Sequence, residues 1–97
     1  MAGLDVRNGK ILNGTAAVGE GSINLATSSK SGRLPLSGVR VRSAGTMRVG
    51  LVTGGPYYNL GAGESVDLGV FQPGDPATLF HIRTGGADVL FDVIIWG

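Results

Sequence analysis

The carboxy-terminal segment 87–96 constrains the fold of this chain more than any other part of the sequence. It is rich in β-branched and aromatic residues, which favour strands. Alternation divides its side chains into two sets: Val89, Phe91, Val93 and Ile95 on one face, and Leu90, Asp92, Ile94 and Trp96 on the other. One set must fill a core. The other is too apolar to face water, so we expect Leu90, Ile94 and Trp96 to pack against a neighbouring subunit, with cover by the N-terminal segment as the alternative.

Glycine is the composition's outlier, at 18 of 97 residues against a usual share of about 7%. These glycines lie between short apolar runs and do not form tracts, which indicates tight turns rather than disorder. No stretch of the sequence convincingly predicts a helix. The chain therefore reads as an all-β protein.

Alternating apolar and polar residues predict about eight short strands separated by turn signals. The predicted strands are 4–7, 10–13, 22–26, 38–42, 47–52, 64–70, 78–83 and 88–96, with a further extended segment at 15–18. This spacing is typical of one antiparallel β-sandwich domain covering residues 1–97, jelly-roll-like, with an immunoglobulin-like sandwich as a close alternative. The strand order stays open at this level.

Dipeptides that favour tight turns mark the predicted connections. Asn8-Gly9 is a strong hairpin signal, and Ala44-Gly45 and Gly85-Gly86 are predicted to turn the chain between paired strands. Gly19–Gly21 predicts a turn or a bulge, and residues 72–76 form a turn with two prolines. Residues 27–33 are polar and are expected to form a surface loop.

Charge and cysteine content narrow the function classes. The formal net charge is +1, so no strong attraction to nucleic acid or to anionic membranes is expected. With no cysteine, neither a disulfide framework nor a thiolate metal site can form. The N-terminus lacks the pattern of a signal peptide, and no apolar run reaches the roughly 18 residues of a membrane-spanning helix. These features permit a cytoplasmic location.

Candidate catalytic and metal sites are sparse. His81 is the only histidine, and we expect it on the surface or at an interface rather than in a catalytic triad. No nucleophile elbow is present, and the acidic residues are scattered along the chain. The sequence therefore predicts a protein that is not an enzyme and has no metal or other cofactor.

Three arginines form the basic cluster of the sequence. Arg40, Arg42 and Arg48 flank the predicted turn at Ala44-Gly45. A two-residue loop in a hairpin would divide them between faces, whereas a three-residue loop would place Arg42 opposite Arg48 in a stripe. Such a stripe could bind an acidic protein surface, and an ordinary solvated face is the alternative.

Tyr57 and Tyr58 lie together in the glycine-rich loop 53–63. Adjacent rings of this kind anchor protein interfaces or stack on sugars. The structural alternative is that one ring caps the end of the sandwich while the other is half exposed.

From Gly38 onward the order of elements resembles that of a known family. The matching segments are Val39–Arg42, Met47–Leu51, Leu60–Ser65, Leu79–Ile82 and Gly85–Phe91. Together they resemble the small β-sandwich decoration, or capsid cement, proteins on the heads of tailed bacteriophages. The resemblance covers about 60 residues and consists of strand and glycine-turn patterns rather than a catalytic signature.

The resemblance implies a non-enzymatic virion protein that is assembled in the host cytoplasm and binds the capsid exterior. Its partners would be the major capsid protein and further copies of itself, as a homotrimer or else a homodimer. Candidate subunit or capsid contacts are Leu90, Ile94, Trp96, Tyr57, Tyr58, Arg40, Arg42 and Arg48. The alternatives are a tail or baseplate component and a carbohydrate-binding host-recognition module that would use the two tyrosines.

Overall fold

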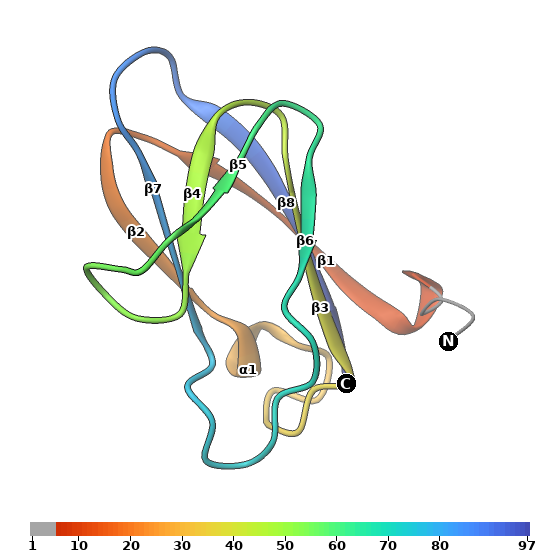
Figure 1. Ribbon diagram of the computed structural model, residues 1–97. Helices are drawn as coiled ribbons and strands as arrows, with labels where there is room; N and C mark the ends of the chain where they lie inside the picture. Colours follow the sequence, from red (N-terminus) through yellow and green to blue (C-terminus); the bar gives the residue numbers. More distant parts are fainter. Residues whose placement is uncertain (1–5) are drawn as a thin grey trace.

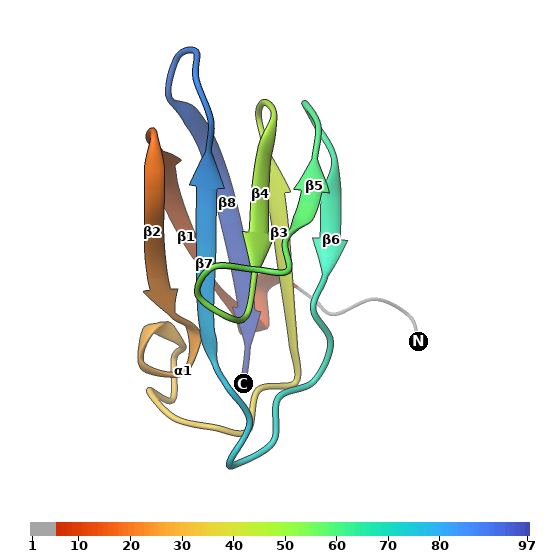
Figure 2. The same cartoon turned by 60° about the vertical axis from the view of Figure 1, so that its left-hand side comes forward.

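The computed structural model describes residues 6–97 as two antiparallel four-stranded sheets packed face to face (Figures 1 and 2). Sheet A has the order β1-β8-β3-β6 and sheet B the order β2-β7-β4-β5. The elements are η1 (Val6–Asn8), β1 (Gly9–Ala16), β2 (Gly19–Asn24), α1 (Leu25–Ser28), β3 (Gly38–Ser43), β4 (Met47–Gly50), β5 (Tyr58–Leu60), β6 (Ser65–Asp67), β7 (Thr78–Arg83) and β8 (Val89–Trp96). No helix among these residues is long and apolar enough to cross a membrane.

The strands pair in a nested order. The first pairs with the last, β2 with β7, β3 with β6 and β4 with β5, and the pairs β3·β8 and β4·β7 join them into two sheets. A chain wound as a double ribbon in this way is a jelly roll, so the predicted class is confirmed. In an immunoglobulin-like sandwich the first two strands share a sheet, whereas β1 and β2 lie in opposite sheets here.

The core lies between the sheets and follows the predicted alternation. On β8, Phe91, Val93 and Ile95 are buried, as expected for the inward set. Other buried apolar side chains come from both sheets: Ala16, Val39, Val41, Met47, Val49, Leu60 and Leu79. Burying an aliphatic or aromatic side chain of this size contributes about 2 kcal/mol before the entropy cost of folding is subtracted. The segment 78–83 forms a strand at the predicted bounds.

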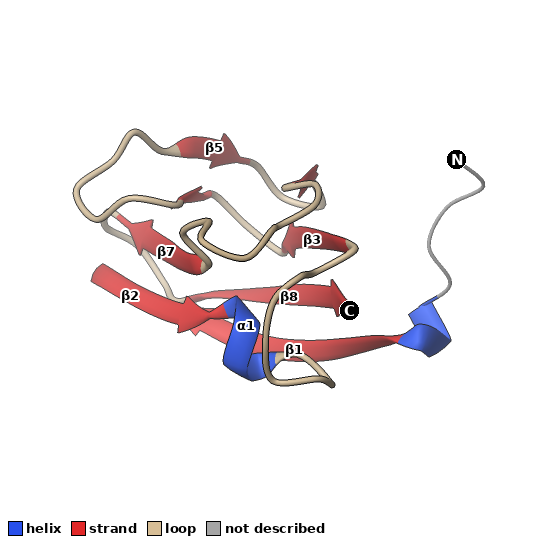
Figure 3. Cartoon of the chain, turned by 90° about the horizontal axis from the view of Figure 1, so that it is seen from below, coloured by secondary structure: helices blue, strands red, loops and turns tan. Residues whose placement is uncertain are grey.

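The predicted hairpin at Asn8-Gly9 is wrong. Residues 6–8 form the short helix η1, and Gly9 begins β1, which pairs with β8 over its whole length from Gly9↔Trp96 to Ala16↔Val89 (Figure 3). The predicted strand 4–7 lies partly outside the described residues. Pairing along all of β8 satisfies far more backbone hydrogen bonds than a local two-residue turn could.

The turn predicted at Gly19–Gly21 is also wrong, because these residues belong to β2. Gly21 is required by packing and not by a turn: a Cβ there would lie 2.5 Å from Cε1 of His81. The predicted strand 22–26 ends early at Asn24. The Asn24 side chain accepts a hydrogen bond from the backbone N–H of Thr27 at 3.1 Å and so caps the single-turn helix α1.

The turns at Ala44-Gly45 and Gly85-Gly86 exist, but they are not hairpins. Each carries the chain from one sheet to the other, since β3 and β8 lie in sheet A while β4 and β7 lie in sheet B. The predicted strand 64–70 is shorter than expected, because β6 covers only Ser65–Asp67 and Val70 is exposed. In a jelly roll, neighbouring segments of chain cross between sheets, which local turn signals do not reveal.

Candidate interaction surface on the outer face of sheet A

The outer face of sheet A carries a mixed apolar and charged surface from four strands. Strand register places two rows of side chains across it: Ile11, Ile94, Arg40 and Asp67 in one row, and Asn13, Asp92, Arg42 and Ser65 in the next. Leu90 and Thr15 continue this face beyond the second row. Alternation along each strand sends these side chains outward and their neighbours into the core.

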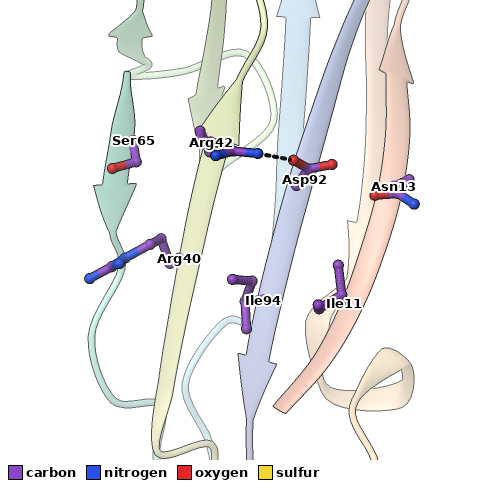
Figure 4. A pocket seen from close by; sticks show the side chains of 7 residues that line it. All are labelled: Ile11, Asn13, Arg40, Arg42, Ser65, Asp92 and Ile94. Carbon is purple, nitrogen blue, oxygen red and sulfur yellow. Dashed lines mark hydrogen bonds and ion pairs between the residues drawn. The ribbon is translucent and has the colours of Figure 1, made fainter. Parts of the chain in front are cut away.

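Two ion pairs cross this face between neighbouring strands. Arg40 donates from Nε to Oδ1 of Asp67 at 2.7 Å and from Nη2 to Oδ2 at 3.4 Å. Arg42 donates from Nη2 to Oδ2 of Asp92 at 3.0 Å (Figure 4). The hydrogen bond from Arg40 holds the pKa of the Asp67 carboxyl below its usual value, and the same contact raises the pKa of Arg40. Both pairs are exposed, so they orient charge on the surface and contribute little to stability.

A shallow pocket of about 300 Å³ lies between the arginines and the apolar residues of β1 and β8 (Figure 4). Ile11 and Ile94 form its apolar side, and Arg40 and Arg42 its charged side. Ile11 is 55% exposed and Leu90 is 64% exposed. Such residues on a flat sheet face are typical of a protein contact surface, where an apolar centre meets a polar rim.

The predicted eight-residue contact set does not form one surface. Arg40, Arg42, Leu90 and Ile94 do share the outer face of sheet A, but Arg48 lies on β4 and points outward from sheet B. The stripe predicted for a three-residue loop is therefore wrong, and the arginines are divided between faces, although not within one hairpin as the two-residue loop implied. Both predictions assumed that the two strands pair as a hairpin, whereas they lie in opposite sheets.

Trp96 does not lie exposed beside Leu90 and Ile94. It is only 6% exposed, and it packs at Gly9, where a Cβ would stand 3.1 Å from the indole Nε1. The ring is therefore not an exposed anchor, and the expected subunit contact through it is wrong because the protomer itself buries the ring. At this end of β8, the alternative of cover by the chain's own N-terminal part describes the packing.

Loop 51–57 covers part of the outer face of sheet B, crossing in front of β7 in Figure 2. Glu20 on β2 holds this loop with three accepted hydrogen bonds: from Oγ1 of Thr53 at 2.7 Å, from the N–H of Gly54 at 3.1 Å, and from the hydroxyl of Tyr57. We call this contact the Glu20 latch. The two outer faces of the sandwich therefore differ: this loop lies over sheet B, whereas Ile11 and Leu90 on the outer face of sheet A are exposed.

The two tyrosines have different surroundings. Tyr57 is partly buried, lies against Gly50 and Gly55, and has its hydroxyl bound to Glu20. Tyr58 is 57% exposed. One ring is packed and the other half exposed, as in the structural alternative, but Tyr57 packs over the outer face of sheet B and does not cap the end of the sandwich. A platform of two free rings does not form.

The hydrogen bond from Tyr57 lowers the pKa of Glu20 below its ordinary value of 4.5, and Thr53 and Gly54 add to the effect. A lowered pKa means that the ionised latch stabilises the closed loop above about pH 4.5 and that this support is lost as the pH falls through the folded-state pKa. We expect Glu20→Gln at pH 7 to lower the protection factor of the Gly54 amide against hydrogen exchange severalfold, because the loop opens more often. Asp75→Asn, which alters a separate turn, should leave that amide unchanged; equal exchange in both variants would contradict the latch.

His81 lies inside the sandwich, which corrects the expected surface position. Its ring faces Phe91 with 4.7 Å between centroids, and its Nδ1 is buried without a hydrogen-bond partner. Burial lowers its pKa, and the nearby Glu20 carboxylate opposes the shift. The histidine is therefore neutral at pH 7 and is positioned to pack, not to exchange protons with solvent. No cluster of potential metal ligands occurs within residues 6–97.

No family model matches the chain, and neither a curated protein nor a solved structure is significantly similar to it. The jelly roll is shared by viral capsid domains, lectins and other proteins, so the fold alone does not identify a function.

Proposed function

We propose that this chain is a non-enzymatic structural protein of a tailed-bacteriophage virion that binds the outer surface of the capsid through the outer face of sheet A. The observation that supports this most directly is that one open sheet face carries both exposed apolar side chains, Ile11 and Leu90, and two ion pairs. Arg40 and Arg42 are the cations of these ion pairs. Exposed Ile and Leu side chains add no stability to a monomer. A protein interface, in contrast, uses such apolar side chains together with the ion pairs beside them.

The charge arrangement suits a lattice contact. Each arginine on this face has a carboxylate partner, so the face is close to neutral and would not attract nucleic acid strongly. Contacts of modest affinity suffice when many identical copies bind one capsid shell, because linked binding sites raise the overall affinity above that of each single site. Low overall charge, at 15% of residues, leaves broad surface for such contacts.

Self-association is part of the proposal, with a homotrimer favoured. Within residues 6–97, the edge strands β1, β6, β2 and β5 each leave one side without a strand partner. Closed symmetric association covers such edges as well as apolar side chains. Leu90 and Ile94 remain the contacts proposed on β8, and Trp96 no longer belongs to this set because the protomer buries it.

Co-sedimentation with capsids assembled without this protein tests the proposal. We expect the wild-type chain to pellet with such capsids and the double variant Ile11→Asp with Leu90→Asp to lose at least about tenfold in apparent affinity, because two buried carboxylates would oppose the apolar contact. Val52→Asp is the matched control, since Val52 is 54% exposed but lies in the loop over sheet B. Failure of the wild-type chain to pellet, or equal loss in the control, would overturn the proposal.

A further inference from the structure

A second pocket, of about 230 Å³, lies at the end of the sandwich where β7 runs into the turn toward β8 and where β4 begins. Figure 1 shows these segments together at the end opposite α1. Two arginines, Arg48 and Arg83, line it, and no acidic residue does. The lining of the pocket is therefore cationic, although Asp88 next to it pairs with Arg83, and the pocket lies apart from the surface on sheet A.

Arg83 points inward and is only 5% exposed. Its Nε donates to the carbonyl of Ala16 at 3.2 Å, and its Nη2 donates to Oδ1 of Asp88 at 3.4 Å. Its Nη1 is buried and has no acceptor within the described chain. A buried guanidinium nitrogen without an acceptor is costly, so its presence calls for an occupant that accepts a hydrogen bond.

A turn of two glycines lies beside that nitrogen and lines the same pocket. A Cβ at Gly86 would stand 3.6 Å from Nη1, and Gly86 itself lines the pocket together with Gly85. Both glycines have positive φ, at 72° and 79°, a conformation that other residues rarely adopt. Gly86 therefore lies against Nη1, and no side chain at this position covers that nitrogen.

Arg48 supplies the second cationic group. It is exposed on the outer face of sheet B, and its guanidinium makes no hydrogen bond or ion pair with any residue in 6–97. The hydroxyl residues Thr46 and Thr84 line the same pocket. Guanidinium groups and hydroxyls are the donors with which proteins hold phosphate.

We propose that this pocket binds a single phosphate-sized oxyanion between Arg48, the free Nη1 of Arg83 and the Thr46 and Thr84 hydroxyls, under the Gly85-Gly86 turn. The anion supplies the acceptor that Nη1 lacks and offsets the charge of Arg48, since Arg83 already has Asp88 as a partner. The phosphate group is either free inorganic phosphate or the phosphoryl end of a larger molecule. This inference does not depend on the proposed capsid contact, which uses the other sheet.

Titration followed by amide NMR tests the site. Inorganic phosphate, added at pH 7 with ionic strength held constant by sodium chloride, should shift the amides of Thr84, Gly85 and Gly86 in a saturable way. Arg48→Ala should weaken the apparent affinity about tenfold or more, because one charge-assisted contact is lost. Arg33→Ala removes the same charge from an exposed site at the opposite end of the sandwich and should change nothing. A phosphomonoester tested beside inorganic phosphate separates the two sources.

A second variant keeps the test independent of folding. Arg83→Lys retains the buried charge but loses the planar guanidinium with its several N–H donors. We therefore expect weaker phosphate binding, while the amide signals away from the pocket stay unchanged. Should this variant unfold, Arg48→Ala decides alone, because an exposed side chain is not needed for the fold. The proposal is overturned by shifts that do not saturate, by equal shifts with acetate, or by unchanged affinity in Arg48→Ala.

Discussion

Phe91→Ala is expected to lower the free energy of unfolding by about 3–5 kcal/mol, the range for removing a buried aromatic ring from a core. Phe91 is 2% exposed and packs its ring against His81 from the opposite sheet. The ring also fills the space over Gly14, where a Cβ would lie 2.4 Å from its Cζ. Deleting the ring therefore opens a cavity that neither Gly14 nor the imidazole can fill. Urea denaturation followed by circular dichroism measures the loss.

The neighbouring residue provides the control for that prediction. Leu90 precedes Phe91 on β8 but points outward and is 64% exposed. In the dissociated protomer, we expect Leu90→Ala to change the free energy of unfolding by no more than about 0.5 kcal/mol, as is usual for an exposed side chain. Similar losses in the two variants would mean that the inner and outer faces of β8 are wrongly assigned.

Trp96→Ala is expected to lower the stability of the isolated protomer by about 3 kcal/mol, because burial of the indole and not a subunit contact holds this ring. The ring is 6% exposed and lies over Gly9 at the start of β1. Its removal should weaken the packing between β1 and β8. The measurement is urea unfolding at several protein concentrations.

Concentration dependence separates the two roles of Trp96. A protomer-core ring gives a stability loss that does not change with protein concentration, whereas an interface ring gives a loss that vanishes on dilution. Trp96→Phe keeps an aromatic ring in the same place and should recover much of the stability. A loss seen only in the associated protein would restore the interface assignment that alternation on β8 first favoured.

Much of the fold could be predicted from local pattern. The inward set on β8, the outward direction of Arg40 and Arg42, and the strand at 78–83 all follow from side-chain alternation, which is a property of the extended backbone itself. The turn at 72–76 follows from its prolines, and Asp75 closes it by donating its N–H to the carbonyl of Gln72 at 3.0 Å.

The candidate sites depended on contacts that local pattern does not contain. Arg48 is close to Arg42 in sequence, yet the two lie on opposite outer faces because the chain changes sheets between them. The sequence marked Tyr57 as a candidate contact residue, but its hydrogen-bond partner Glu20 lies on a strand that is distant in the sequence. The sequence did not predict the cationic pocket, because Arg83 takes an inward position in the alternation of its strand and belongs to no recognisable binding motif.

The positions of most strands, the division of each strand into inner and outer faces, and the all-β class follow from the sequence alone, because a period of two is set within each strand by its own backbone. The short strand β5, in the predicted loop 53–63, does not. The sheet to which each strand belongs was decided only in the tertiary structure. Nested pairing joins β1 to β8 and β2 to β7 across nearly the whole chain, and it is selected by the burial and hydrogen bonding of all eight strands together. That selection is what placed Arg40 and Arg42 on one face and left Arg48 with Arg83 at the end of the sandwich.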